Sequence, residues 1–190
     1  MNVERTISSP LEELEKTVKQ CKKCGLSKYR INAVFGEGNP KAKVMFVGEG
    51  PGYDEDRQGR PFVGKAGQLL TRILQSINLQ REEVYITNVV KCRPPQNRNP
   101  RPDEINSCNP FLMMQIKTIS PKIICALGTF SAQTLLKTDE KITTLRGKIY
   151  ELEGIKIVPT YHPAYLLRNP DKKREVWEDM KRISKMMEDQ

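Results

Sequence analysis

The chain contains a single histidine, His162, so any chemical step that needs an imidazole depends on this residue. A buried neutral imidazole can donate a hydrogen bond to an oxygen that gains negative charge, and a protonated imidazole also neutralises that charge. The competing interpretation is structural, with the ring only capping a loop. Taken alone, His162 fits the capping role better than a catalytic one, so its surroundings must decide.

The five cysteines divide by spacing into four and one. Cys21 and Cys24 form a C-x-x-C pair, and Cys92 and Cys108 follow in a segment rich in proline, asparagine and arginine. Four thiolates can hold a tetrahedral zinc ion or a 4Fe-4S cluster, and the absence of a second C-x-x-C pair favours the cluster. Unligated thiols are the alternative. Cys125 lies in an apolar run, where a thiol behaves as a small hydrophobe, so we expect it in the core.

Apolar runs bounded by turn residues predict four buried strands. These runs lie at 43–49, 84–90, 122–127 and 155–159. Helical spacing separates them, at 69–77 and after Gly128. This alternation predicts a parallel sheet with helices on both faces.

Two further helices are expected at the ends of the chain. Ser9 and Glu12 have the spacing of a capping box, which predicts a short helix that leads into Cys21. The segment 171–187 has the pattern of a closing helix. Its residues expected to face inward are Val176, Trp177, Met180 and Ile183.

Three polar residues follow the predicted strands. Glu49 ends the first strand, Asn88 lies near the end of the second, and His162 comes shortly after the fourth. Ligands of open parallel sheets bind outside the carboxyl ends of the strands. Each residue alone has an ordinary structural explanation, but their convergence predicts a binding site.

Composition limits the class of protein and of partner. The chain has 190 residues, enough for one domain with its own core, and no apolar run long enough to cross a bilayer. Its N-terminus lacks the layout of a secretory signal, so we expect a cytoplasmic protein without membrane contact. Its net charge of +9 suits a polyanion such as DNA or RNA, although a lysine-rich solvated surface would give the same charge.

Four segments carry a more specific pattern: GEGPG at 48–52, GRPFVG at 59–64, ITNVVKCRPP at 86–95 and HPAYLL at 162–167. Together they closely resemble the family-4 uracil-DNA glycosylases, the iron–sulfur members of that superfamily, known from thermophilic archaea and bacteria. The similarity extends from about Cys21 to Leu167 and includes the cysteine spacing. Any one segment alone would be weak evidence, whereas the joint match is specific.

The resemblance implies a three-layer α/β/α sandwich around a central four-stranded parallel sheet, with residues 1–190 as a single domain. It implies an enzyme that removes uracil from single- or double-stranded DNA, acting as a monomer. It also implies a 4Fe-4S cluster, with zinc as the less favoured occupant, on Cys21, Cys24, Cys92 and Cys108. By motif position, the residues that form the uracil pocket in the family correspond to Gly48, Glu49, Gly50, Phe62, Asn88 and His162.

Each pocket residue suits a task. Asn88 can meet an acceptor and a donor on the pairing edge of uracil, and Phe62 can stack on the base without choosing which base. We expect His162 to donate to uracil O2 as the base leaves as an anion. Glu49 can orient or deprotonate the attacking water, but better-known uracil glycosylases carry an aspartate where this chain has Gly50, which puts that role in doubt.

Positions beside the pocket are candidates for DNA contact. They are Arg93, Arg98, Leu166, Leu167 and Arg168. The arginines of the proline-rich loop would meet phosphates, and the other three would fill the space of the extruded base. An ordinary solvated loop is the alternative for the arginines.

Rival functions remain at this point. A related glycosylase with wider base choice, such as a family-5 enzyme, would share most of these features. A non-catalytic nucleic-acid-binding module would keep the charge and the cysteines but would not need Asn88, Phe62 and His162 together. An electron-transfer enzyme ranks last, because no second cofactor motif is present.

Overall fold

Six strands form one mixed sheet in the order β1-β3-β2-β4-β6-β5 in the computed structural model, which describes residues 9–188. The four central strands, β3, β2, β4 and β6, are parallel to one another. The edge strands β1 and β5 pair antiparallel with β3 and β6. The strands are β1 (Glu37–Gly38), β2 (Val44–Gly48), β3 (Tyr85–Asn88), β4 (Ile123–Leu127), β5 (Tyr150–Leu152) and β6 (Ile155–Thr160).

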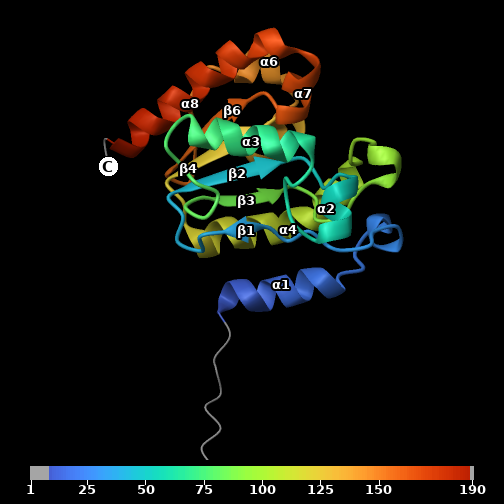
Figure 1. Ribbon diagram of the computed structural model, residues 1–190. Helices are drawn as coiled ribbons and strands as arrows, with labels where there is room; N and C mark the ends of the chain where they lie inside the picture. The colour runs from blue at the N-terminus through green and yellow to red at the C-terminus, as the bar shows by residue number, and fades with distance from the viewer. Residues whose placement is uncertain (1–8, 189–190) are drawn as a thin grey trace, which may run out of the picture.

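Helices cover both faces of this sheet, with α3 and α8 on one side and α1 and α4 on the other (Figure 1). The α-helices are α1 (Pro10–Gln20), α2 (Tyr53–Gln58), α3 (Lys65–Gln75), α4 (Pro102–Ile119), α5 (Thr129–Leu136), α6 (Ile142–Leu145), α7 (Pro163–Arg168) and α8 (Lys173–Glu188). Short 3-10 turns lie at Gly25–Lys28, Pro95–Asn97 and Pro170–Lys172. None of the helices in the described part of the chain combines the length and apolarity needed to cross a bilayer.

The core has two halves, one on each face of the sheet. Along β2, Val44 and Phe46 pack toward α3 and α8, whereas Met45 and Val47 pack toward α1, α4 and α5. Successive strand residues point to opposite faces, so one fully apolar strand supplies both layers. The expected α/β/α sandwich with four central parallel strands is confirmed, as is the core position of Cys125.

Local patterns at the chain ends give one success and one error. The capping box is present, since the Ser9 amide donates to Glu12 Oε2 at 2.9 Å and the Glu12 amide to Ser9 Oγ at 3.3 Å. The inward prediction for Trp177 is wrong, because this side chain is 41% exposed. Val176, Met180 and Ile183 share one helical stripe, and Trp177 lies about 100° away from Val176 on the helix.

Two edge strands, β1 and β5, and four helices, α2, α4, α6 and α7, escaped prediction. The edge strands β1 and β5 have only two and three residues, too few to show an alternating pattern. Helix α4 begins at Pro102 and contains Pro110, so its sequence reads as a loop although its apolar residues are buried. This helix matters for function because it carries Cys108.

Candidate active site

A cavity of about 340 Å³ opens at the carboxyl ends of the central strands, the edge of the sheet near α2 (Figure 1). It unites residues from four separate segments of the chain. The predicted uracil-pocket residues that line it are Glu49, Gly50, Phe62, Asn88 and His162, and the predicted DNA-contact residues Arg98 and Arg168 line it as well. The convergence expected at this edge is therefore present.

Asn88 lies at the end of β3 and is only 2% exposed. Its Oδ1 is buried and has no hydrogen-bond partner among the described residues. A buried unsatisfied acceptor costs about 1–3 kcal/mol, so native proteins rarely keep one without a use. The side chain faces a cavity large enough for a planar base, and a donor from a ligand would satisfy it.

Gly48 supports this arrangement from β2. It is paired in register with Asn88, and a Cβ at position 48 would collide with Asn88 Oδ1 and with the ring of Phe62. A side chain here would push both pocket residues aside. Gly48 is thus needed for the close approach of Asn88 and Phe62, although it does not line the cavity itself.

A buried lysine forms hydrogen bonds that fix the end of β3. Lys91 Nζ donates to the Asn88 carbonyl at 2.6 Å, to Thr87 Oγ1 at 2.7 Å and to Gln115 Oε1 at 2.6 Å. Burial lowers the pKa of Lys91 to about 8, and the three acceptors satisfy all of its donors. This network fixes the backbone that carries the Asn88 amide.

His162 combines the two roles that its sequence context left open. It is the N-cap of α7, and its Nδ1 accepts a hydrogen bond from the Ala164 amide at 3.1 Å. Burial, followed by the charge of Arg168, lowers the pKa of the imidazole to about 4. The ring is therefore neutral at pH 7, and because Nδ1 is an acceptor the proton is on Nε2. The cap fixes the tautomer that leaves Nε2 as a donor.

The ring of Phe62 stands next to this imidazole, with centroids 5.5 Å apart. Phe62 has a φ of 53°, a left-handed conformation that costs energy for a bulky residue. The surroundings must enforce this backbone, and the aromatic face is thereby held at the wall of the cavity.

Glu49 follows directly after β2 and lines the cavity. Burial raises the pKa of its carboxyl group to about 7. Within residues 9–188, no hydrogen bond or ion pair to the carboxylate is observed. A carboxyl group that titrates near neutral pH in a binding cavity is suited to proton transfer.

The four clustered cysteines line a second cavity. Arg30 Nη1 donates to Cys92 Sγ at 3.0 Å, and the Lys91 amide donates to Cys108 Sγ at 3.3 Å. Burial raises the pKa of Cys92, and that of Cys108 to about 11. Within the described residues, no three His, Cys, Asp or Glu side chains form a group close enough for one metal ion. None of the five cysteines forms a disulfide.

Comparison with known proteins agrees with this geometry. A family model of the uracil-DNA glycosylase superfamily matches residues 35–181. A type-4 uracil-DNA glycosylase from Sulfurisphaera tokodaii is 49% identical over 185 residues, 93% of this chain and 84% of the relative. Another from Archaeoglobus fulgidus is 46% identical over 184 residues, 93% of this chain and 92% of the relative. The chain belongs to the type-4 uracil-DNA glycosylases. A type-5 enzyme from Pyrobaculum aerophilum is 31% identical over 146 residues, 68% of this chain and 64% of the relative.

The positions expected to touch DNA differ in this type-4 chain. Leu166 is fully buried under α7, so as placed it cannot act as a wedge, whereas Leu167 is 44% exposed. Helix periodicity explains the error, because neighbouring residues point about 100° apart. Arg168 lines the cavity. Leu167 and Arg168 therefore remain the candidates for the residue that fills the space of the extruded base.

The two loop arginines are also unlike each other. Arg98 makes a two-bond ion pair with Glu104, with N to O distances of 2.9 and 2.6 Å. Arg93 stacks its guanidinium 5.1 Å from the Tyr53 ring centre. Arg93 forms no ion pair with an acidic side chain within residues 9–188, so it is the better candidate for a phosphate contact.

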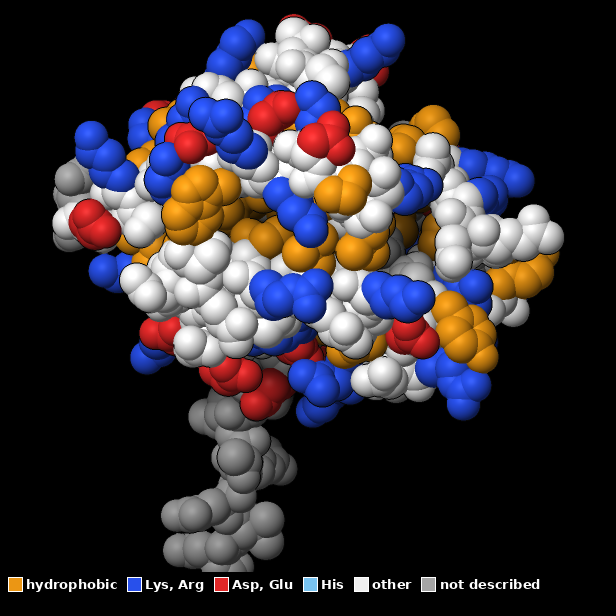
Figure 2. All heavy atoms as spheres, turned by 45° about the horizontal axis from the view of Figure 1, so that its top comes forward, with side chains coloured by type: hydrophobic (Ala, Val, Ile, Leu, Met, Phe, Trp, Pro, Cys, Tyr) orange, Lys and Arg blue, Asp and Glu red, His pale blue; other side chains and the backbone are white. Residues whose placement is uncertain are grey.

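The face that carries α3 and α8 shows many Lys and Arg side chains around an apolar groove (Figure 2). The groove is lined by Ile73, Trp177 and Met180 among others. Leu166 of α7 lines the groove together with Arg72 and Lys173, so part of the net positive charge lies beside α7. It is compatible with the approach of a polyanion.

Sequence reasoning missed the residues that support the type-4 pocket. Lys91 and Gln115 hold Asn88, and Glu55 and Arg81 hold the backbone around Phe62. Glu55 gave a weak signal, since it stands three residues after Gly52 in a capping-box position. Nothing in the sequence around Arg81 indicated its role.

Proposed function

We propose that this chain hydrolyses the N-glycosidic bond of deoxyuridine in DNA, releasing uracil and leaving an abasic site for base excision repair. The observation that carries the proposal is the unpartnered, buried Oδ1 of Asn88. The N3–H group of uracil supplies the missing donor, while the Asn88 amide NH2 donates to uracil O4. Cytosine has no hydrogen on N3 and carries an amino group at C4, so it meets Asn88 with the wrong pattern.

His162 stabilises the leaving group. As the glycosidic bond breaks, the sugar becomes cation-like and negative charge gathers on uracil O2. A neutral imidazole with its proton on Nε2 donates to this oxygen without first having to lose or gain a proton. One such donor contributes roughly 100- to 1,000-fold to turnover in other enzymes that stabilise an oxyanion.

Glu49 acts on the water that attacks C1′. A carboxyl group with a pKa of about 7 is partly ionised at neutral pH and can accept a proton or orient the water. Its position one residue before Gly50 makes its reach different from that of an aspartate at position 50. We therefore assign it the lesser share of catalysis, after anion stabilisation by His162.

The cysteine site is a structural clip. Cys21, Cys24, Cys92 and Cys108 would hold a 4Fe-4S cluster, since they surround one cavity and three of their sulfurs accept N–H hydrogen bonds, as cluster ligands do. When bound, the group ties α1 to the end of β3 and to α4. The lack of disulfides among the five cysteines, together with a DNA substrate, suits the cytoplasm. We expect the chain to act as a single-domain monomer.

The test is incubation with oligonucleotides that contain uracil, hypoxanthine, a thymine–guanine mismatch or no lesion, followed by alkaline cleavage. Abasic product from the uracil strands alone is the expected result. Excision of hypoxanthine or thymine at similar rates would favour the broader base choice of a type-5-like enzyme. No product from any strand would exclude the enzyme and leave a binding module.

A further inference from the structure

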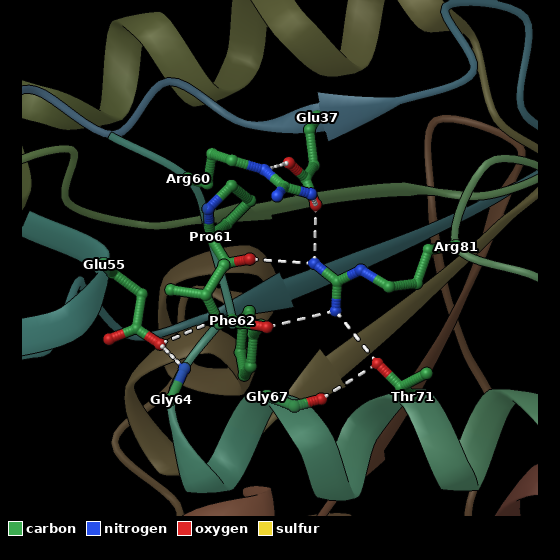
Figure 3. Close-up of polar contacts among 10 residues, drawn as sticks. Glu37, Glu55, Arg60, Pro61, Phe62, Gly64, Gly67, Thr71 and Arg81 are labelled. Carbon is green, nitrogen blue, oxygen red and sulfur yellow. Dashed lines mark hydrogen bonds and ion pairs between the residues drawn. The ribbon is translucent and has the colours of Figure 1, made fainter. Parts of the chain in front are cut away.

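The left-handed backbone of Phe62 is held from one side by Arg81 (Figure 3). Arg81 Nη2 donates to the Pro61 carbonyl at 2.8 Å, and Nη1 donates to the Phe62 carbonyl at 3.1 Å and to Thr71 Oγ1 at 3.3 Å. The guanidinium is largely buried and is anchored by Glu37, whose Oε1 lies 2.6 Å from Nη2. Arg81 thus binds the two carbonyl groups of Pro61 and Phe62.

Glu55 holds the same loop from the other side. Its Oε1 accepts hydrogen bonds from the amides of Val63 and Gly64, both at 2.9 Å, and its Oε2 accepts one from the Gly52 amide at 3.1 Å. Gly52 belongs to the loop that follows Glu49. One carboxylate therefore joins the loop that carries Phe62 to the loop after Glu49, and both loops line the cavity.

Opposite charges thus act on the two sides of one residue: a cation on the carbonyls up to Phe62 and an anion on the amides after it. Charge-assisted hydrogen bonds of this kind are stronger and more directional than neutral ones. The backbone of α3 also packs closely against this loop, because a Cβ at Gly67 would collide with the Phe62 carbonyl. This arrangement gives a physical reason why Phe62 keeps a conformation that it would otherwise avoid.

We propose that Arg81 and Glu55 are positioning residues for base recognition, which clamp Phe62 so that its ring is ready to stack on the extruded base. The inference rests on the proposed function, because it assigns stacking to Phe62. A preformed stacking face avoids the loss of rotamer and loop freedom when the base enters. Arg81 and Glu55 both lie outside the four sequence segments that resemble the pocket motifs of the family.

The chain offers a matched control for Arg81. Arg60 pairs with the same Glu37, with Nε to Oε2 at 2.7 Å, but it is exposed and makes no hydrogen bond to Pro61 or Phe62 carbonyls. Arg60→Met therefore removes one charge and one partner of Glu37 without touching the clamp. Arg81→Met removes the clamp as well.

The experiment is a double-mutant cycle on uracil-containing duplex DNA, with kcat and KM measured for wild type, Arg81→Met, Phe62→Ala and the double variant. Stacking on an aromatic ring contributes about 1–3 kcal/mol, so Phe62→Ala should lower kcat/KM roughly 5- to 150-fold. We expect Arg81→Met to lower kcat/KM at least fivefold and to divide the loss between kcat and KM as Phe62→Ala does. In the Phe62→Ala background the same change should cost less than twofold, and Arg60→Met should stay within twofold of wild type.

Two results would overturn the inference. One is full activity in Arg81→Met, and the other is a loss that is equally large with and without the Phe62 ring, which would mark a general effect on folding. If Arg81→Met does not fold by circular dichroism, Glu55→Gln replaces it in the same cycle, because it keeps the side-chain size and one acceptor. A wild-type protein that releases no uracil would instead reject the proposed function, whereas an active wild type with an additive cycle rejects only the clamp.

Discussion

The uracil cavity and the cysteine site lie at the same end of β3, only four residues apart along the chain, yet they are built in opposite ways. The cavity keeps polar groups unsatisfied or shifted in pKa, namely Asn88, Glu49 and His162. The cysteine site is closed, with Cys92 and Cys108 buried and their sulfurs accepting hydrogen bonds. Polar groups without a protein partner can still bond to a substrate, whereas groups that already have protein partners stabilise the fold. Changes at the two sites should therefore affect different quantities.

The largest effect is expected on stability, from Cys92→Ser. Loss of one ligand should remove the visible absorption of a bound cluster and open a closed loop of roughly 70 residues, at a cost of about 4 kcal/mol in the free energy of unfolding. Iron content and chemical denaturation measure the two results. Cys125→Ala is the control, since this thiol lies in the core on the opposite face of the sheet from the ligand set. Normal iron content and stability in Cys92→Ser would show that the thiols are unligated.

The cavity should respond in turnover rather than in stability. His162→Asn removes the donor to uracil O2 but keeps a good helix N-cap, so α7 should stay folded. Single-turnover cleavage should slow by roughly 100- to 1,000-fold, with binding of uracil DNA changed less than about threefold by fluorescence anisotropy. Wild-type rates from this variant would remove His162 from the mechanism.

The pH profile should separate Glu49 from His162. With the pKa of Glu49 at about 7, its ionised fraction and the cleavage rate should rise by about tenfold between pH 6 and 8, while His162 stays neutral throughout. Glu49→Gln should be slower and nearly independent of pH in this range. An unchanged profile in Glu49→Gln would mean that another group activates the water.

The same carboxyl group has a stability effect of known sign. It binds its proton up to about pH 7 when folded but loses it near 4.5 when unfolded, so the folded state holds more protons in this window. Stability should fall as the pH rises from 4.5 to 7. Chemical denaturation of Glu49→Gln should show a smaller decrease of the unfolding free energy over this pH range. That result would mean that Glu49 is kept for function at the expense of stability.

The smallest effect is expected at the rim of the cavity. Leu167→Ala should lower activity on double-stranded uracil DNA by about two- to fivefold relative to single strands, because a wedge is needed only where a base must leave a stack. Met114→Ala is the control, a similarly exposed apolar residue on α4, which covers the other face of the sheet. Equal losses on both substrates would show that Leu167 does not help to extrude the base.

The sequence predicted the elements and the chemical groups better than their supports. Strand-forming runs are long and apolar because the central strands are buried on both faces, so β2, β3, β4 and β6 were visible. Asn88 and His162 were visible because their residue types and places at strand ends are unusual for a core. Trp177 was misjudged, since an apolar residue at the edge of a helical stripe can face either way.

The supports were not predictable because they join distant segments through backbone groups. Arg81 recognises the carbonyls of Pro61 and Phe62, and any residue would supply those carbonyls. Lys91 likewise binds the Asn88 carbonyl, and its full burial contradicts the usual exposure of lysine. Only the folded chain brings such partners together.

The sole histidine permits one direct test of the central claim, that a neutral His162 donates from Nε2 to uracil. In protein labelled with ¹⁵N only at histidine, the nuclear magnetic resonance spectrum should show one imidazole, protonated on Nε2, with a pKa near 4. Addition of uracil should shift the Nε2 proton as the hydrogen bond forms. A proton on Nδ1, a pKa above 6, or no response to uracil would contradict the account.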